Sequence, residues 1–242
     1  MEGIKFKTEY SGLEELAPIQ PASNFIPQWF KDMPTHMEFP AGERLQPNHS
    51  NNFGKMGKIA EKFYSSTMKR CPAVVDFVTE GYIMPYWTDT LIQRDAMSLE
   101  ADSKHWPKHI SFHDSKQIPT YPLEDGDFPH AVKFHSPWYF YTPKNYSLLF
   151  IQPFYQRERR FTVLPAIVHT DRWHEVNFPT IIHDDEFTIT QGTPFIQIIP
   201  FKRSKLSMVM EYLNQKDKNR LDANNLYVQT NFIGGYRKRT SG

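Results

Sequence analysis

The chain has 242 residues, 28 lysines and arginines against 27 aspartates and glutamates, and a single cysteine, Cys71. A chain of this length can bury a full core without disulfides or a metal ion, and one cysteine excludes an intramolecular disulfide and a cysteine-based metal site. The balanced charge gives no nucleic-acid signal. No run of 18 apolar residues is present to span a membrane, and "MEGIKFKTEYSG" lacks the apolar core of a secretory signal. We expect a soluble, cytoplasmic protein.

Nineteen prolines and an aromatic content of 15% predict a mainly β fold of short strands and ordered loops with little helix. Residues 1–53 carry six of the prolines among scattered aromatics, which indicates an extended N-terminal arm that packs on a neighbouring surface. Within this arm, "IPQWFKDMP" predicts a single helical turn that ends at Pro34. A β-rich domain over 54–217 and a loosely attached tail over 218–242 complete the predicted organisation.

Two further helices are predicted from apolar residues at helical spacing. The first covers roughly 55–70 and is stopped by Pro72, with Met56, Ile59, Ala60, Phe63 and Thr67 on one face. The second covers 205–216 with Ser204 as its N-cap, and its apolar face comprises Leu206, Val209, Met210 and Leu213. We expect both to lie at the periphery of the β domain.

The strand pattern begins near 88–95, passes through a loop-rich stretch over 100–135, and becomes strong from 137 onward. Short apolar runs there are bounded by proline, glycine or charged pairs: "WYFYT", "YSLLFIQPF", "RFTVLPAIVHT", "HEVNFPTII", "EFTIT" and "FIQIIPF". Such spacing is typical of a β-sandwich or barrel-like domain.

Motifs for metal and cofactor chemistry are weak. His105, His109 and His113 recur at spacings of four, but Pro107 interrupts the helix that a zinc site would need, and there is no H-E-x-x-H arrangement. His169 and Asp171 form an H-x-D pair resembling the iron ligands of 2-oxoglutarate oxygenases, yet no histidine follows His183 to complete the triad. We predict no metal and no cofactor, and a buried structural thiol at Cys71.

Residues 143–201 resemble the core of the dUTPase and dCTP-deaminase superfamily, which has a β-clip fold. "AIVHTDRWHEV" stands in the place of that family's third motif, and "ITQGTPFIQII" stands in the place of its last. Gly192 and Gln197 match the family glycine and glutamine, while Asp171 and Glu175 match two acidic positions. The resemblance implies a β-clip core at 137–201 and association into homo-oligomers, of which trimers are frequent.

The catalytic residues of that family do not carry over. His169 stands where the family has the aspartate that activates water, Arg172 replaces the tyrosine on which the nucleotide packs, and "FIQPFYQ" lacks the Arg-Ser-Ser that holds phosphates. The remaining candidates are His169 as a base with Asp171 and Glu175 as acidic partners, and a ligand-binding set of Arg172, Trp173, His174 and Gln197. The alternative is that "HTDRWH" is a polar network that holds the sheet together.

Most of the chain is similar to an uncharacterised family of tailed, mainly marine, bacteriophages. The residues that carry this are "IPQWFKDMP", "CPAVVDFVTEGYIMPYWTD", "SPWYFYTPKNYSLLFIQP", "AIVHTDRW" and "GTPFIQIIPFKR". The resemblance implies a phage protein in the host cytoplasm, the virion, or both, and brings no activity with it.

Three functions therefore stay open at the level of sequence. The first is a non-catalytic virion-associated or structural accessory component that is homo-oligomeric and contacts other virion proteins. The second is a module that binds a nucleotide or other small ligand in the dUTPase-like cleft. The third is an enzyme, either a nucleotide hydrolase or metal-dependent, that uses His169 and Asp171.

Overall fold

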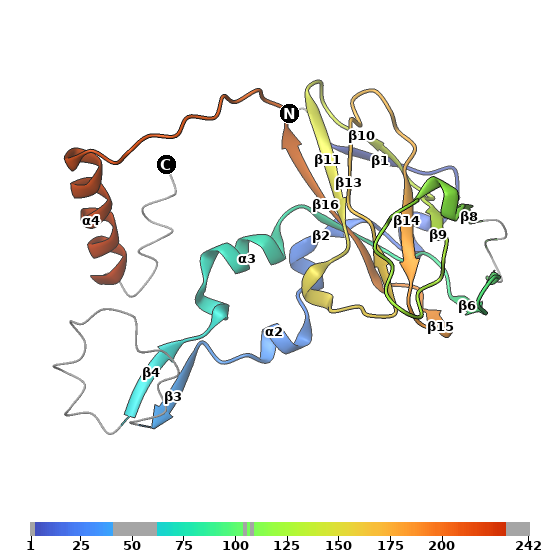
Figure 1. Cartoon of the computed structure of the whole chain (residues 1–242), viewed down its shortest axis with the longest axis horizontal. Helices are drawn as coiled ribbons and strands as arrows, with labels where there is room; N and C mark the ends of the chain where they lie inside the picture. The colour runs from blue at the N-terminus through green and yellow to red at the C-terminus, as the bar shows by residue number, and fades with distance from the viewer. Residues whose placement is uncertain (1–2, 41–61, 104–105, 107–108, 231–242) are drawn as a thin grey trace. The chain divides into compact units, whose positions relative to one another are not determined.

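The computed structural model describes residues 3–40, 62–103, 106 and 109–230 (Figure 1). The chain divides into two compact units, one formed by residues 1–28 with 78–203 and the other by residues 29–77 with 204–242. The fold is mainly β, as the composition predicts, and every strand pairing within the described residues is antiparallel.

A five-stranded sheet forms one part of the first unit. Its order is β13 (Ala166–Val168), β11 (Tyr146–Ile151), β16 (Pro194–Lys202), β5 (Tyr82–Pro85) and β2 (Gln20–Pro21). Leu149 in β11 lies opposite Ile167 on one side and Ile199 on the other. Since β13 and β16 are both antiparallel to β11, they run in the same direction and finish at the same end of the sheet.

Two smaller sheets and a strand pair complete this unit. The four-stranded sheet has the order β12 (Phe161–Val163), β14 (Asn177–Ile182), β9 (Ala131–His135) and β8 (Ile110–His113). The three-stranded sheet has the order β15 (Glu186–Ile189), β6 (Thr90–Arg94) and β7 (Leu99–Asp102). In addition, β1 (Lys5–Lys7) pairs with β10 (Tyr139–Tyr141).

All three sheets contribute to one aromatic core. Phe195 in β16 is fully buried, and its ring lies within 6.0 Å, centroid to centroid, of five others: Tyr86, Trp87, Phe134, Phe161 and Phe178. Buried and exposed positions alternate along strands such as β12 and β15, as expected of sheets with one solvated face. The core therefore explains the high aromatic content of the sequence.

The free edge of β12 is closed by one side chain. The Gln152 amide oxygen accepts a hydrogen bond from the Val163 N–H at 2.8 Å. Its amide nitrogen donates to the carbonyl oxygens of Phe161 at 3.3 Å and Glu158 at 3.4 Å. Gln152 thus bonds to β12 as a neighbouring strand would.

Part of the predicted N-terminal arm lies within the first unit. Strands β1 and β2 belong to it, and between them the short helix α1 (Leu13–Leu16) places Leu13 in the hydrophobic core. The single helical turn predicted near Pro34 is present as α2 (Gln28–Asp32). Residues 41–53 of the arm lie outside the described residues.

The helix predicted over 55–70 is wrong for its described part. Residues Lys62–Ser66 form strand β4, which pairs with β3 (His36–Pro40), and Met68–Arg70 form a 3₁₀ turn, η2. Cross-strand hydrogen bonds replace the helical ones here, and the side-chain hydroxyl of Thr67 donates to the Pro34 carbonyl at 2.6 Å. Residues 55–61 of the prediction lie outside the described residues.

A helix does follow η2. It is α3 (Pro72–Thr79), which begins at the proline that was predicted to stop the earlier helix. Cys71 follows η2 and precedes α3, so it belongs to neither element. It is exposed, and the prediction of a buried thiol is wrong.

The helix predicted over 205–216 is displaced toward the C-terminus. Residues 204–214 contain no regular secondary structure, and α4 covers Gln215–Thr230. Asn214, and not Ser204, starts the helix, since its side-chain oxygen accepts from the Asp217 N–H at 2.9 Å. Much of the predicted loose tail is therefore helical, and residues 231–242 lie outside the described residues. No helix among the described residues is both long and apolar enough to cross a bilayer.

Candidate functional site

The residues singled out by "HTDRWH" lie on and just after a turn that follows β13. Backbone N–H groups of Arg172 and Trp173 donate to the His169 carbonyl at 2.9 and 3.0 Å and close the turn. The side chains of His169, Arg172, Trp173 and Glu175 are exposed. An imidazole, a guanidinium, an indole and a carboxylate are therefore all accessible to solvent within seven residues of sequence.

Asp171 faces inward from the same turn and is held on both carboxylate oxygens. Arg203 donates to its Oδ1 at 2.9 Å and to its Oδ2 at 2.5 Å, and the Asn145 N–H donates to Oδ2 at 3.0 Å. Its side chain is 5% exposed. Hydrogen bonds from Arg203, supported by the Asn145 N–H, hold the pKa of Asp171 well below its usual range.

The sheet topology explains this pair. Asp171 follows β13 and Arg203 follows β16, and these two strands finish at the same end of the sheet on either side of β11. The Arg203 guanidinium also donates to the Tyr146 carbonyl at 3.0 Å and to the Ser147 hydroxyl at 2.8 Å, both in β11. Asp171 and Arg203 thus fasten three strand ends together, which is the role of a polar network that holds the sheet.

His174 is fixed by two contacts. Its Nδ1 lies 3.0 Å from the Phe140 carbonyl, which can only accept, so the ring proton resides on Nδ1 and leaves Nε2 as an acceptor. Its ring stacks on Tyr141 at 3.9 Å with an interplanar angle of 23°. The Lys7 ammonium lies 4.6 Å from the centre of the Tyr141 ring. These contacts tie the turn to β10 and β1.

Gln197 does not join the residues of the turn. It lies in the middle of β16, six positions before Arg203, which corresponds to about 20 Å along an extended strand. It is buried, and its amide nitrogen donates to the Glu80 carbonyl at 3.0 Å.

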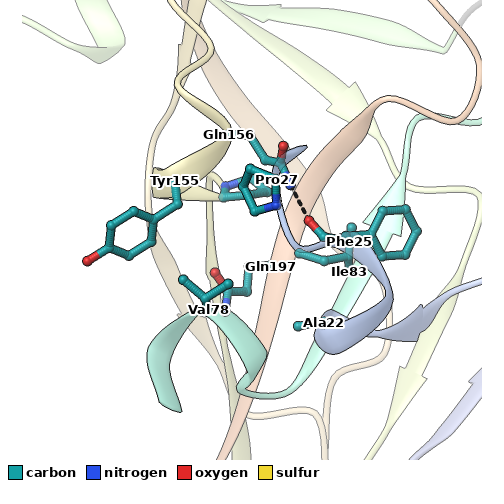
Figure 2. Close-up of a pocket in the computed structure, with 9 residues that line it drawn as sticks. Ala22, Phe25, Pro27, Val78, Ile83, Tyr155, Gln156 and Gln197 are labelled. Atoms are coloured by element: carbon teal, nitrogen blue, oxygen red, sulfur yellow. Dashed lines mark hydrogen bonds between the residues drawn. The ribbon is translucent and has the colours of Figure 1, made fainter. Parts of the chain in front are cut away.

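Figure 2 shows Gln197 beside a small cavity that Val78, Ile83 and the loop around Phe25 also line. The side-chain amide of Gln156 closes part of this cavity by donating to the Phe25 carbonyl at 2.6 Å. The cavity holds about 20 Å³, enough for roughly one water molecule and not for a nucleotide.

A second polar cluster has no counterpart in the sequence motifs. His183 Nδ1 lies 2.6 Å from Asp127 Oδ1, and His183 Nε2 lies 2.7 Å from the Thr162 hydroxyl. Since a carboxylate only accepts, Nδ1 donates to Asp127 and Nε2 accepts from Thr162. The order of hydroxyl, imidazole and carboxylate is that of a catalytic triad, but it also joins β12, the end of β14 and the loop before Phe128.

Arg94 fixes two of those three segments. Its guanidinium donates to the carbonyl oxygens of Gly126 and His183 at 2.5 and 2.6 Å and, through Nε, to that of Asp184 at 3.1 Å. The same group forms an ion pair with Asp185 at 3.0 Å. Because Thr162, His183 and Asp127 are separated by 21 to 56 residues in sequence, no local motif announces the cluster.

The histidines of the loop-rich stretch do not gather. His109 is buried, with its Nδ1 2.5 Å from the Trp106 carbonyl, and His113 is half-buried in β8. His105 lies outside the described residues. Among the residues that the structure describes, no group of three His, Cys, Asp or Glu side chains is arranged to hold a metal ion.

An open cleft of about 440 Å³ lies elsewhere in the first unit, between the start of β7, the end of β8 and the segment that leads into β9. Aromatic and aliphatic side chains form its floor and walls, and a few polar groups stand at its rim. Its volume is in the range of small-molecule sites.

No protein-family model matches the chain, and no curated protein sequence matches it either.

Proposed function

We propose that this protein is a non-catalytic assembly component that works as a homo-oligomer, and that residues 204–213, the apolar segment, make the contact between copies. The observation that carries the proposal is the exposure of this segment. Six of its ten residues are large and apolar, and each is at least 66% exposed: Leu206, Met208, Val209, Met210, Tyr212 and Leu213.

Such a surface is costly for a monomer. Burying a Leu, Val or Met side chain contributes about 1.5–3 kcal/mol, so six side chains represent on the order of 10 kcal/mol of burial that the single chain does not use. Soluble monomers rarely leave an apolar patch of this size uncovered, and those that do use it to contact a partner.

A second copy of the chain suits the apolar segment. The segment has no helix or turn of its own, and Leu206, Met208, Met210 and Tyr212 alternate along it as they would on one face of a strand. The sheets are antiparallel, and edge strand β13 carries Ile167, which is 58% exposed, with the exposed Trp173 just beyond it. Strand addition at such an edge is a common mode of recognition. A net charge of +1 adds little repulsion between copies.

The pairing of Asp171 supports the non-catalytic part of the proposal. A carboxylate that accepts three hydrogen bonds and pairs with Arg203 is engaged in holding strand ends, and both of its oxygens are occupied. A general base or metal ligand at this position would need an oxygen aimed at the substrate or metal.

The β-clip architecture of residues 137–201 and a place in a tailed-phage particle are part of the same proposal, and the resemblance of the sequence supports both. A virion component is expected at a fixed copy number in purified particles of the phage that encodes it, as measured by quantitative mass spectrometry. If the protein is found only in infected cells, its assembly role belongs to the host cytoplasm.

Oligomerisation can be tested directly by light scattering coupled to size exclusion, or by sedimentation velocity. We expect the intact chain to form a discrete oligomer, and we expect Leu206→Ser, Met210→Ser and Tyr212→Ser combined to shift it to a monomer. The control replaces Leu16 and Leu221, exposed apolar residues outside the segment, with serine and should leave the oligomer unchanged. A wild type that is monomeric at about 100 μM would contradict the proposal, since its dissociation constant would exceed about 100 μM, which corresponds to an association free energy weaker than roughly −5.5 kcal/mol.

A further inference from the structure

The open cleft in the first unit has a floor that the hydrophobic core fixes in place. Phe128 and Leu99 form this floor, and both are buried. Phe128 is held by ring contacts with Phe112 at 6.3 Å and with His130 at 5.3 Å, the latter edge-on. Because the floor belongs to the core, it is in place before a ligand binds.

The walls are apolar and face solvent. Phe112 is 42% exposed and Met97 is 76% exposed, and they rise from different segments of the chain. A flat ring inserted between an aromatic face and a thioether gains contact on both sides while displacing water from apolar surface. The walls therefore favour a planar guest.

Three polar side chains at the rim are oriented by the 3₁₀ turn η3 (Ser115–Gln117) and its cap. The Ser115 N–H donates to His130 Nδ1 at 3.0 Å, so a neutral His130 ring carries its proton on Nε2. Gln117 Oε1 accepts from the Asp114 N–H at 2.9 Å, which leaves the amide NH₂ of Gln117 as the outward group. Asp114 Oδ1 accepts from the Lys116 N–H at 2.9 Å.

These bonds determine which hydrogen-bond donors and acceptors remain available to a guest molecule. His130 Nε2 and the Gln117 NH₂ are donors. The Asp114 carboxylate accepts from the backbone N–H groups of Lys116 and Gln117, and since a carboxylate has about four acceptor sites, it can still accept from a guest. Each group is fixed by a bond on its other side, so little side-chain entropy is lost when a guest binds. The lining residues that the structure describes include one carboxylate and no lysine or arginine, which disfavours anionic guests.

From this geometry we infer that the cleft binds an uncharged, planar amino-heteroaromatic ring, of the kind found in adenine and cytosine. The exocyclic amine of the ring donates to Asp114, its ring nitrogen or carbonyl accepts from Gln117 or His130, and its faces lie between Phe112 and Met97. Because no lysine or arginine is among the described lining residues, we expect the guest to be the free base or the nucleoside and not a nucleoside triphosphate. This inference does not rest on the assembly role.

The test uses the full-length protein with cytidine, adenosine and uridine as probes, followed by ligand-observed NMR and calorimetry. Uridine has a carbonyl in place of the cytidine amine and is the matched negative. We expect saturable 1:1 binding of cytidine or adenosine, with uridine at least about tenfold weaker. Once the guest covers Asp114, a carbonyl in place of the amine leaves that acceptor without its donor, which costs about 1–3 kcal/mol, or roughly 5- to 150-fold. Cytidine triphosphate should bind no more tightly than cytidine.

Two variants locate the site. Phe112→Ala removes one wall and should weaken binding by about tenfold. Asp114→Asn keeps the shape of the side chain but replaces one carboxylate oxygen with an amide NH₂, and should reduce the preference for cytidine over uridine. Tyr121→Ala, an equally exposed aromatic in the same stretch but outside the lining, should bind like the wild type.

The inference is overturned if all three nucleosides fail to saturate near 1 mM, if uridine binds as well as cytidine, or if Phe112→Ala and Asp114→Asn bind like the wild type while remaining folded by circular dichroism. A shift of Phe112→Ala to a smaller oligomer without any change in nucleoside affinity also overturns it, since the wall would then serve as a protein contact.

Discussion

Asp171 lies in a conspicuous sequence motif, but its structural role is set by a residue that is distant in sequence. It sits in a stretch rich in histidine, arginine and tryptophan, which is a composition typical of a site. Its partner Arg203 is 32 residues away and stands beyond the last strand of the sheet. Nothing local to either residue predicts the pair, because it depends on β13 and β16 lying on either side of β11.

This pair should make stability depend on acidity. Folding lowers the pKa of Asp171 below that of the unfolded chain, so its contribution is present above about pH 4 and is lost as pH falls through the folded pKa. We expect Asp171→Asn to lower the melting temperature at pH 7 and to melt closer to the wild type at pH 2.5. Glu175→Gln, an exposed carboxylate after the same turn, should leave both melting curves unchanged. Equal melting of the wild type and Asp171→Asn at both pH values would refute this account.

At the level of elements, the strands were predicted well from 137 onward, and the two longer helices poorly. Prolines flank β11, Gly192 and Pro194 mark the start of β16, and the pair Asp184 and Asp185 follows β14; the apolar runs have strand length. Helical spacing of apolar residues failed at both 62–66 and 205–214. In the first case pairing with β3 takes the backbone hydrogen bonds, and in the second the helix starts only where Asn214 caps it. Apolar residues do recur at helical spacing in both segments. A local pattern does not reveal that β3 pairs with the first segment or that the helix after the second begins at Asn214.

The cleft was missed for a related reason. Its lining comes from the segments around 97–99, 112–117 and 128–130, which are distant in sequence, and the pairing of β8 with β9 brings the second of them beside the third. The sequence marked this stretch as loop-rich and drew attention to its histidines as metal ligands. His130 instead serves as a fixed hydrogen-bond donor in the inferred site.

The turn between α3 and β5 depends on one glycine. Gly81 has φ of +69°, and a Cβ there would lie 2.1 Å from the Ile198 carbonyl oxygen in β16. Gly81→Ala should therefore cost about 3 kcal/mol of unfolding free energy through steric overlap. Gly192→Ala is the matched control, since φ is +85° there but no atom lies within 4 Å, and it should cost only about 1 kcal/mol. Urea denaturation distinguishes them; equal losses would mean that β16 moves away to make room.

At the scale of the whole molecule, two histidines make the stability of the fold depend on pH. Burial lowers the pKa of His109, and the nearby charge of His135 lowers it further. Burial also lowers the pKa of His135, with a smaller effect from Lys133. The unfolded chain therefore binds protons more readily than the folded one below about pH 6.5, and acidification favours unfolding.

We expect the melting temperature to fall between pH 7.5 and pH 5.0, and to fall less in His109→Gln. His113→Gln, in the neighbouring strand β8, should show the wild-type fall. Differential scanning calorimetry at matched ionic strength measures both. A fall of the same size in His109→Gln would show that other groups set the pH dependence.

The Gln152 amide at the edge of β12 has a consequence beyond the folded chain. Two of the outward backbone groups of β12, the Val163 N–H and the Phe161 C=O, are already bonded, which hinders the addition of a strand from another chain at this edge. Edge strand β13 is the side at which the proposed assembly adds a strand. The same fold can thus direct self-association to one sheet edge and discourage it at another.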